Sequence, residues 1–334
     1  MNSAQAFVAL GKWIRSNDAE LQHLIHQAAN ANPWFTPENV ELAVKSVASQ
    51  FLDERALKTW LSSYQDRKRS NRIVGLILAG NIPMVGFHDI LCVLASGHRA
   101  LVKLSDKDDL LIPALMQKIG EWYPDIVNRI EFVSRLKDFD AIIATGSNQS
   151  AAYFEKYFSK YPHIIRKNRN AVAVLTGNES GEELTKLGED IFSHFGLGCR
   201  NVSKIYVPEN YDFTGFLTVM NSFKHVIEHS KYRNNLDYHL AAAVISRQNY
   251  MSSDNLILLE NVSISSKIGV LHYEHYDQLS SLESQLQKQH EQIQCIVAGE
   301  SVMTLPSVRF GEAQRPALQE YADGVDTMQF LYAL

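Results

Sequence analysis

Cysteine is scarce in this chain of 334 residues, which has three, at Cys92, Cys199 and Cys295. A number so small and odd excludes a disulfide framework and indicates a reducing compartment. The first twenty residues contain no basic stretch followed by a long apolar one. We therefore predict no secretory signal and expect a cytoplasmic protein.

Long apolar runs and a surplus of basic charge are also absent. The longest apolar stretches, such as residues 73–80, are far shorter than the ~20 residues that a membrane-spanning helix needs. Lys and Arg number 32 against 37 Asp and Glu, a net charge of −5, which argues against a dedicated nucleic-acid-binding protein. With 46% apolar and 21% charged residues, the composition is typical of a globular chain. We expect no membrane span and no nucleic-acid partner.

Several common nucleotide-binding and catalytic motifs are missing. The sequence has no G-x-G-x-x-G, no G-x-S-x-G and no H-E-x-x-H. Gly80 and Gly86 have the glycine spacing of a P-loop, but Phe87 stands where that loop needs lysine. Ordinary Rossmann, α/β-hydrolase, zincin and P-loop assignments therefore have no support.

Histidine and cysteine pairs are scattered at helical spacing. Examples are His225 with His229 and His88 with Cys92. Zinc needs three or four ligands, and twelve histidines give such pairs by chance. We expect no metal site.

Residues 1–70 are predicted to form a helical segment. Apolar residues recur at three- and four-residue spacing from Leu21 to Ala28, and Thr36-Pro37 has the signature of a helix start. A polar, basic linker follows at residues 65–72.

Two blocks of alternating strands and helices follow. In the first, strands are expected at 73–80, 100–104, 129–133 and 141–144, with helices at 85–96, 108–122 and 150–158. In the second, strands are expected at 171–175, 203–208, 256–260, 268–273 and 295–299, with helices at 181–195, 211–229, 236–247 and 279–292. Such alternation predicts βαβ units and a parallel sheet with helices on both faces. The predicted fold class is α/β, with the helical segment 1–70 and α/β domains at 71–170 and 171–334.

The segment FGLGCRNVSKIYV, residues 195–207, carries the most specific local signal. Cys199 follows two closely spaced glycines, comes after a helix and precedes a strand. Glycines beside a nucleophile let backbone N–H groups face a substrate, and the nearby Arg200 and Lys204 would lower the pKa of the thiol. The alternative is that Cys199 is a small buried filler, as Cys92 and Cys295 are expected to be.

This segment resembles the nucleophile region of the aldehyde dehydrogenase superfamily. Three further pieces resemble it in the same order: Gly80-Asn81-Ile82-Pro83, Leu101-Val102-Lys103-Leu104-Ser105-Asp106 and Thr145-Gly146-Ser147. The resemblance implies a Rossmann-like cofactor sheet at 71–170 and a catalytic sheet at 171–334.

The same resemblance implies roles for these residues. Cys199 would be the nucleophile, and the Asn81 amide would help to form the oxyanion hole. Lys103, Ser105 and Asp106 match the turn that binds the adenosine ribose, although Leu104 replaces a proline of the superfamily. Gly146 and Ser147 match the turn that holds the pyrophosphate. Taken singly, Asn81 could be a turn residue, Lys103 a surface lysine and Ser147 only an N-cap.

The glutamate that activates water in hydrolytic members has no counterpart. The matching stretch, residues 163–170, contains no acidic residue. An acyl-cysteine should then resist water and await a thiol or a hydride. In that stretch Arg166, Lys167 and Arg169 either meet cofactor or CoA phosphates or form a solvated face.

Within that superfamily, the chain also resembles the LuxC-type acyl-CoA or acyl-protein thioester reductases. Residues 229–246 and 321–328 resemble two stretches of that family, and the resemblance covers about residues 70–334. It implies reduction of a fatty acyl thioester to a fatty aldehyde through an acyl-cysteine. It also implies NADPH, while Asp106 suits the NAD ribose and leaves NADH open.

The resemblance to LuxC-type reductases also bears on partners, and other functions remain as alternatives. An acyltransferase or acyl-protein synthetase partner is implied, and a homo-oligomer is open. Two other enzymes remain as alternatives, a reductase of acyl phosphates and a cofactor-independent cysteine acyltransferase. A catalytically silent scaffold is the alternative from a different class.

Overall fold

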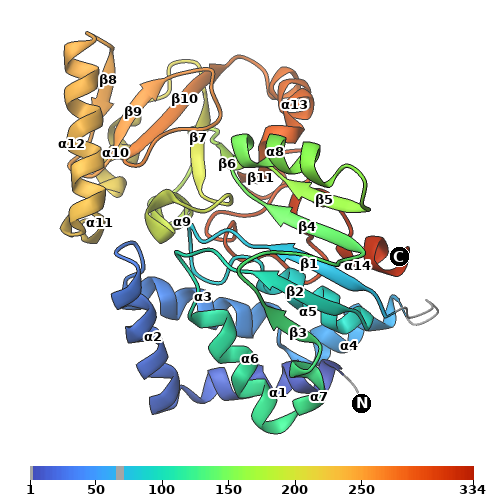
Figure 1. The fold of residues 1–334 in the computed structure, drawn as a ribbon. Helices are drawn as coiled ribbons and strands as arrows, with labels where there is room; N and C mark the ends of the chain where they lie inside the picture. The colour runs from blue at the N-terminus through green and yellow to red at the C-terminus, as the bar shows by residue number, and fades with distance from the viewer. Residues whose placement is uncertain (1–2, 65–70) are drawn as a thin grey trace. The chain divides into compact units, whose positions relative to one another are not determined.

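Two sheets organise the chain, each in its own unit (Figure 1). The structure is a computed structural model that describes residues 3–64 and 71–334. One unit comprises Met1–Asn168 with Pro316–Leu334, and the other comprises Arg169–Arg315. The α/β class predicted from the sequence is confirmed. The predicted linker at 65–72 lies largely outside the described residues.

The first unit holds the helical N-terminal segment and a five-stranded sheet. Its elements are α1 (Ser3–Ser16), α2 (Ala19–Ala31), α3 (Pro37–Gln50), α4 (Glu54–Ser62), β1 (Ile73–Ile77), α5 (Phe87–Ser96), β2 (Arg99–Lys103), α6 (Leu111–Trp122), α7 (Pro124–Val127), β3 (Ile130–Phe132), β4 (Ala141–Thr145), α8 (Asn148–Phe158), β5 (His163–Arg166), η3 (Ala322–Gly324) and α14 (Thr327–Tyr332). The strands run parallel in the order β3-β2-β1-β4-β5. In Figure 1, α5 and α6 lie on one side of this sheet and α8 on the other.

One hydrophobic core joins the N-terminal helices to the first face of this sheet. It contains Phe7 and Leu57 from the helices, and Val74 and Val102 from the strands. Apolar residues at helical spacing in the helices meet the alternate apolar residues of the strands. Segment 1–70 is therefore part of the same unit as the sheet.

The second face of the sheet is covered only in part. Residues 133–140 connect β3 to β4 without forming a helix. The helix that packs on the second face is therefore α8, which follows β4. Leu136 and Phe139 cover the sheet at Gly75 instead, 3.2 Å and 3.4 Å from where a Cβ would stand. Helices thus lie on both faces of the sheet, as expected, but no helix lies over β2 and β3 on the second face, because this connection is too short for one.

The C-terminal segment returns to the first unit, which differs from the predicted domain at 171–334. Asp326 caps α14 and accepts a hydrogen bond from Tyr64, 2.9 Å away. Trp60 donates to the Tyr321 hydroxyl at 2.7 Å. Leu318, Met328 and Leu331 are buried in the same core as helices α1 to α4. These contacts give the motif at 321–328 a structural role.

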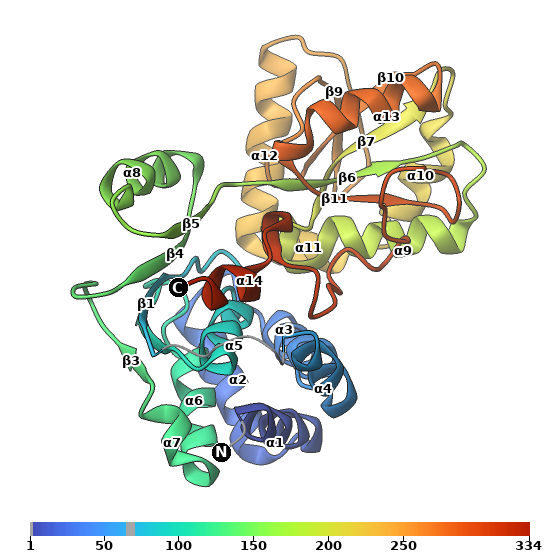
Figure 2. The same ribbon diagram turned by 90° about the vertical axis from the view of Figure 1, so that its right-hand side faces the viewer.

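The second unit holds the other sheet. Its elements are β6 (Asn170–Val174), α9 (Gly181–Phe192), η1 (Ser193–Gly196), β7 (Val202–Pro208), α10 (Phe213–Met220), α11 (His225–Glu228), α12 (Ser230–Ile245), β8 (Tyr250–Ser252), β9 (Ile257–Glu260), β10 (Val270–Tyr276), α13 (Leu279–Lys288), η2 (His290–Gln292) and β11 (Ile293–Ala298). The order is β11-β6-β7-β10-β9-β8, with β8 antiparallel to β9. In Figure 2 this sheet lies between α13 and α9.

All four helices predicted for this unit have different bounds: α9 ends at Phe192 and α13 at Lys288, and the other two differ more. The helix expected at 211–229 is two helices, α10 and α11, with a turn at 221–224 between them. The helix expected at 236–247 begins at Ser230, where the His229 ring nitrogen accepts from the N–H of Tyr232. No helix in the described residues has both the length and the hydropathy that crossing a bilayer requires.

Candidate active-site elements

The turn that carries Cys199 begins where α9 ends. His194, Phe195 and Gly196 are three consecutive residues with positive φ, at 50°, 58° and 75°. Only glycine adopts this region without strain, and such strain concentrates at functional sites. The chain thereby leaves the helix axis abruptly, and Cys199 comes to lie exposed just before β7. The alternative that Cys199 is a buried filler does not fit this exposure.

Asn201 supports this turn from within. Its side chain is 1% exposed, and its Oδ1 accepts from the N–H of Gly198 at 2.8 Å. Its Nδ2 donates to the carbonyl oxygens of Asp190, Ile191 and Ser193, at 3.0, 3.3 and 2.8 Å. One amide therefore satisfies carbonyl groups at the end of α9 and fixes the backbone next to Cys199. Sequence reasoning missed it, although it stands two residues after the cysteine.

The segment at 229–246 packs against the same turn. The His229 ring lies 4.3 Å from the Phe195 ring, centroid to centroid, and Tyr232 is 6.1 Å from it. Tyr232 is buried and donates to the carbonyl oxygen of Asn255. This motif therefore supports the strained backbone before Cys199.

The charged and titratable neighbours of Cys199 in sequence lie in different environments. Lys204 is fully buried, and its ammonium contacts the Glu274 carboxylate and the Val262 carbonyl oxygen. Its charge is thus compensated by Glu274 rather than directed at a thiol. Burial lowers the pKa of His194 to about 4, so this ring is neutral at pH 7. Arg200 donates to the carbonyl oxygen of Ala313.

In the first unit, the residues predicted to bind the cofactor follow neighbouring parallel strands. Ile77 of β1 pairs with Lys103 of β2 on one side and with Ala144 of β4 on the other. The carboxyl ends of these strands, and the turns after them, therefore share one edge of the sheet. The order β3-β2-β1-β4 reverses direction at β1, and such a switch point is where open α/β sheets bind ligands.

The turns after β1 and β2 are in contact. A Cβ at Gly80 would stand 2.7 Å from the Ser105 Oγ, so only glycine allows this approach. Asn81, Asp106 and Ser147 are exposed, and Lys103 is half-buried. The structure brings Asn81 and Ser105 to neighbouring turns of one unit, while Cys199 belongs to the other unit.

Asp108 joins these two turns and was not singled out in the sequence. It is buried, and its Oδ2 accepts from the N–H of Met84 at 2.8 Å. Its own N–H donates to the Ser105 carbonyl oxygen at 3.0 Å. Burial raises the pKa of this carboxyl to about 6, against the opposing effect of the Met84 N–H. The only sequence signal for Asp108 was that it is an acidic residue close to Ser105 and Asp106.

The turn after β4 begins α8. Ser147 is the N-cap, and its Oγ accepts from the N–H of Ser150 at 3.2 Å. A Cβ at Gly146 would stand 2.9 Å from the Ser150 Cβ, so the backbone of this turn lies close to the helix. A capped helix start next to glycine suits a phosphate group.

The basic residues at 166–169 separate into different environments. Arg166 is buried, forms an ion pair with Asp89, and donates to the Thr327 hydroxyl at 3.0 Å. Arg169 donates to the carbonyl oxygen of His290, whereas Lys167 is exposed. The phosphate interpretation is therefore wrong for Arg166, because Asp89 already neutralises it. In residues 3–64 and 71–334, no group of three or more potential metal ligands is found.

Comparisons with known proteins show the fold. No protein-family model and no curated protein matches the sequence. Aldehyde dehydrogenase 21 from Physcomitrella patens, in complex with the product succinate, is similar over 98% of this chain and 84% of its own, with TM-score 0.69 and 12% identity. An oxidoreductase from Marinobacter aquaeolei has TM-score 0.67 and 12% identity, covering 89% of this chain and 73% of its own.

A third similar structure is a cysteine-to-alanine mutant of aldehyde dehydrogenase C from Pseudomonas syringae, in complex with NAD+ and octanal. It has TM-score 0.63 and 13% identity, over 90% of this chain and 72% of its own. Together with the two sheets described above, these likenesses confirm the predicted fold: the chain has an aldehyde-dehydrogenase-like fold.

Proposed function

We propose that this chain reduces an acyl thioester, carried by CoA or by a protein, to an aldehyde through an acyl intermediate on Cys199. The observation that carries the proposal is the exposed Cys199 on a strained turn, braced by Asn201, in an aldehyde-dehydrogenase-like fold. Reactive cysteines differ from structural ones in being accessible.

In the first step, the Cys199 sulfur attacks the carbonyl carbon of the thioester. A carbon–sulfur bond to Cys199 forms, the bond to the carrier sulfur breaks, and the carrier leaves as a thiol after taking up a proton. The negative charge that develops on the carbonyl oxygen needs donors. We assign this role to the backbone N–H of Cys199 and the side-chain amide of Asn81, and one such donor is worth roughly 3–4 kcal/mol of barrier.

The sheet edge in the first unit suits a nicotinamide cofactor. The close approach of Gly80 to Ser105, and the glycine turn before capped helix α8, leave backbone accessible at a switch point. Lys103, Ser105 and Asp106 would hold the ribose, and Gly146 and Ser147 the pyrophosphate. Bound there, the cofactor would supply a hydride equivalent to the acyl carbon, after which the Cys199 sulfur leaves and the aldehyde is released.

The choice of cofactor depends on the charges at the turn after β2. Exposed Asp106 suits the ribose hydroxyl of NADH, whereas Lys103 and exposed Lys107 suit the extra phosphate of NADPH. We propose NADPH, with NADH as the alternative. Overall, a thioester, the reduced cofactor and one proton give an aldehyde, a thiol and the oxidised cofactor.

The absence of an acid at residues 163–170 supports reduction over hydrolysis. Residues 163–170 contain no Asp or Glu, so this stretch offers no carboxylate base. An acyl-cysteine without a base to activate water persists until a hydride reaches it.

Intact-protein mass spectrometry tests the proposal. The wild-type chain, Cys199→Ala and the control Cys295→Ala are incubated separately with acyl-CoAs of several chain lengths, an acyl-protein thioester and acyl phosphates, first without reductant and then with NADPH or NADH. We expect an acyl adduct on the wild type and the control that is absent from Cys199→Ala and is cleared by NADPH with release of aldehyde.

The other outcomes overturn the proposal in distinct ways. An adduct that neither NADPH nor NADH removes, and that hydrolyses slowly, indicates a cysteine acyltransferase. An adduct formed from acyl phosphates, but not from CoA or protein thioesters, indicates the acyl phosphate reductase. No adduct from any donor leaves Cys199 without a catalytic role and indicates a silent scaffold.

A further inference from the structure

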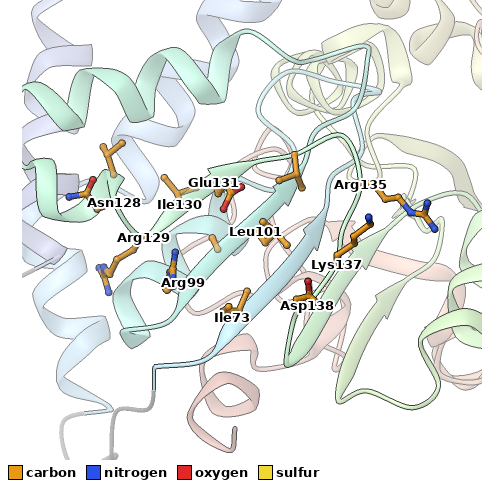
Figure 3. A pocket seen from close by; sticks show the side chains of 13 residues that line it. Ile73, Arg99, Leu101, Asn128, Arg129, Ile130, Glu131, Arg135, Lys137 and Asp138 are labelled. Carbon is orange, nitrogen blue, oxygen red and sulfur yellow. The ribbon is translucent and has the colours of Figure 1, made fainter.

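The uncovered face of the first sheet forms a groove of about 580 Å³ (Figure 3). Its floor is the face of β2 and β3 that points away from the main core. Register assigns Arg99 and Leu101 to this face, since they pair with Ile73 and Gly75, and Glu131 pairs with Leu101. The groove is separate from the turns at the carboxyl ends of the strands, where we place the cofactor.

The groove exists because one crossover helix is missing. Parallel sheets are normally covered on both faces by the helices that connect their strands. Here α8 covers β4 and β5, and the connection at 133–140 forms no helix but packs Leu136 and Phe139 beside α8. The space over β2 and β3 is where a connecting helix would otherwise lie.

The lining of the groove combines apolar and charged side chains, and more of the charged ones are basic than acidic. Leu101, Ile73 and Val133 are half-buried. Figure 3 shows Leu101 in the middle, Arg135 and Lys137 towards one end, and Asn128 and Arg129 towards the other. Arg129 already donates to Ser3 and to the Leu94 carbonyl oxygen.

The remaining basic side chains are available to a ligand. Arg99, Arg135 and Lys137 are exposed, and within the described part of the chain none of the three forms an ion pair. The acidic side chains lining the groove, Glu131 and Asp138, are fewer than the basic ones. This local excess of positive charge occurs in a chain whose net charge is −5.

We propose that this groove docks an acidic amphipathic helix of a partner protein. A helix in the position of the missing crossover would place apolar side chains on Leu101, Ile73 and Val133. Its Asp and Glu side chains would meet Arg99, Arg135 and Lys137, which charge complementarity favours. The inference concerns the first unit alone and does not depend on the chemistry of Cys199.

Fluorescence anisotropy tests this surface on the full chain. The probe is a labelled, capped 16-residue peptide with Leu on one helical face and Glu on the other, compared with a scrambled peptide of the same composition. The groove variant is Arg99→Glu, Arg135→Glu and Lys137→Glu combined. The control variant reverses Lys156, Lys224 and Lys288, which are also exposed, and so changes the net charge equally.

We expect saturable binding of the amphipathic peptide that weakens with salt. Binding should fall about tenfold or more in the groove variant and stay within about threefold in the control variant. Circular dichroism and the melting temperature establish that the groove variant is folded.

Three results would overturn the inference. Equal binding by the wild type and the groove variant removes the groove as the site. Equal binding of the scrambled peptide reduces the surface to a general polyanion contact. Self-association of the wild type that the groove variant abolishes, measured by light scattering, assigns the face to a second copy of the chain.

Discussion

Asn201 is the residue on which the geometry around Cys199 most depends. It is buried and makes four side-chain hydrogen bonds, one to the N–H of Gly198 and three to carbonyl groups at the end of α9. A turn with three successive left-handed residues needs such bracing, because His194 and Phe195 prefer other conformations. Its loss should affect both the stability of the unit and the position of the thiol.

Replacing Asn201 with Ala should lower the free energy of unfolding by roughly 2–4 kcal/mol, since buried backbone groups lose their partner. Because Cys199, the proposed nucleophile, would shift, we expect kcat to fall by about a hundredfold. Urea unfolding and steady-state kinetics measure the two effects.

The matched control for this change is Asn255→Ala. Asn255 is equally buried in the same unit, and its amide donates to the carbonyl oxygen of Met220. It should lose comparable stability with kcat within about threefold of wild type. Equal losses of kcat in both variants would mean that Asn201 acts through stability alone.

Asp108 should make stability depend on pH in a specific window. Burial raises its folded-state pKa to about 6 from the ordinary 3.8, so the folded protein binds this proton more tightly than the unfolded chain does. The stabilising contribution is therefore full below about pH 4, declines as the pH rises to about 6, and is constant above.

Asp108→Asn should remove this dependence and still accept the Met84 N–H. Measured by urea unfolding between pH 4 and 8, stability relative to wild type should rise with pH by about 3 kcal/mol. Asp106→Asn changes an exposed carboxyl two residues away and should leave the wild-type profile unaltered. Parallel profiles for Asp108→Asn and wild type would contradict the assignment.

At the scale of elements, two helices begin with the same type of cap in different units. Ser147 caps α8 at the predicted pyrophosphate turn, and Ser180 caps α9 with Glu183 in a capping box. Both serines are exposed. Comparing substitutions of these two serines distinguishes the effect of losing a helix cap on stability from the effect of losing a cofactor contact on binding.

Ser147→Ala and Ser180→Ala should each cost about 1 kcal/mol of stability. Only Ser147→Ala should also weaken NADPH binding, by roughly tenfold, because a hydrogen bond to a charged group is lost. Calorimetric titration of the apo protein with NADPH measures this. Unchanged affinity in Ser147→Ala would leave that residue as a cap only.

For the whole molecule, the division into units makes a prediction about folding. The second unit, Arg169–Arg315, is one continuous segment, whereas the first needs both ends of the chain. The C-terminal segment hydrogen-bonds with the N-terminal part of this unit. Tyr321 accepts a hydrogen bond from Trp60, and Asp326 accepts one from Tyr64. The Leu331 carbonyl oxygen is hydrogen-bonded to the buried His98 ring. Without the C-terminal segment, these polar groups lose their partners and part of the core is exposed.

A fragment of residues 169–315 should fold alone and unfold cooperatively in urea. A fragment of residues 1–168 should not fold, and adding residues 316–334 through a Gly/Ser linker should restore it. Circular dichroism and urea unfolding of the three fragments provide the test. A folded 1–168 fragment would show that the returning segment is dispensable.

Much of the fold was predictable from the sequence. Short apolar runs bounded by glycine and proline predict strands such as β1 and β7, because buried parallel strands need such residues on both faces. The order of motifs around Asn81, Lys103, Gly146 and Cys199 predicts the architecture. The structure confirms the architecture, while the roles of these residues remain predictions.

The remainder depends on contacts between distant parts of the chain. Arg166 pairs with Asp89 across 77 positions, and Tyr321 meets Trp60 across 261. No local pattern reveals which buried group will find which partner. The end of α9 could not be predicted from the sequence either. His194 and Phe195 are residue types that occur in helices, and their positive φ angles accompany hydrogen bonds from the Asn201 side chain to the end of α9.

The measurement that tests the central claim most directly is hydride transfer to the product. The chain is incubated with an acyl-CoA and NADPH carrying deuterium at both C4 positions, and the aldehyde is analysed by mass spectrometry. We predict an aldehyde with one deuterium on its carbonyl carbon, formed by wild type and Cys295→Ala but not by Cys199→Ala. Release of free fatty acid without deuterated aldehyde, or an aldehyde that forms equally without Cys199, would contradict a cysteine-dependent thioester reductase.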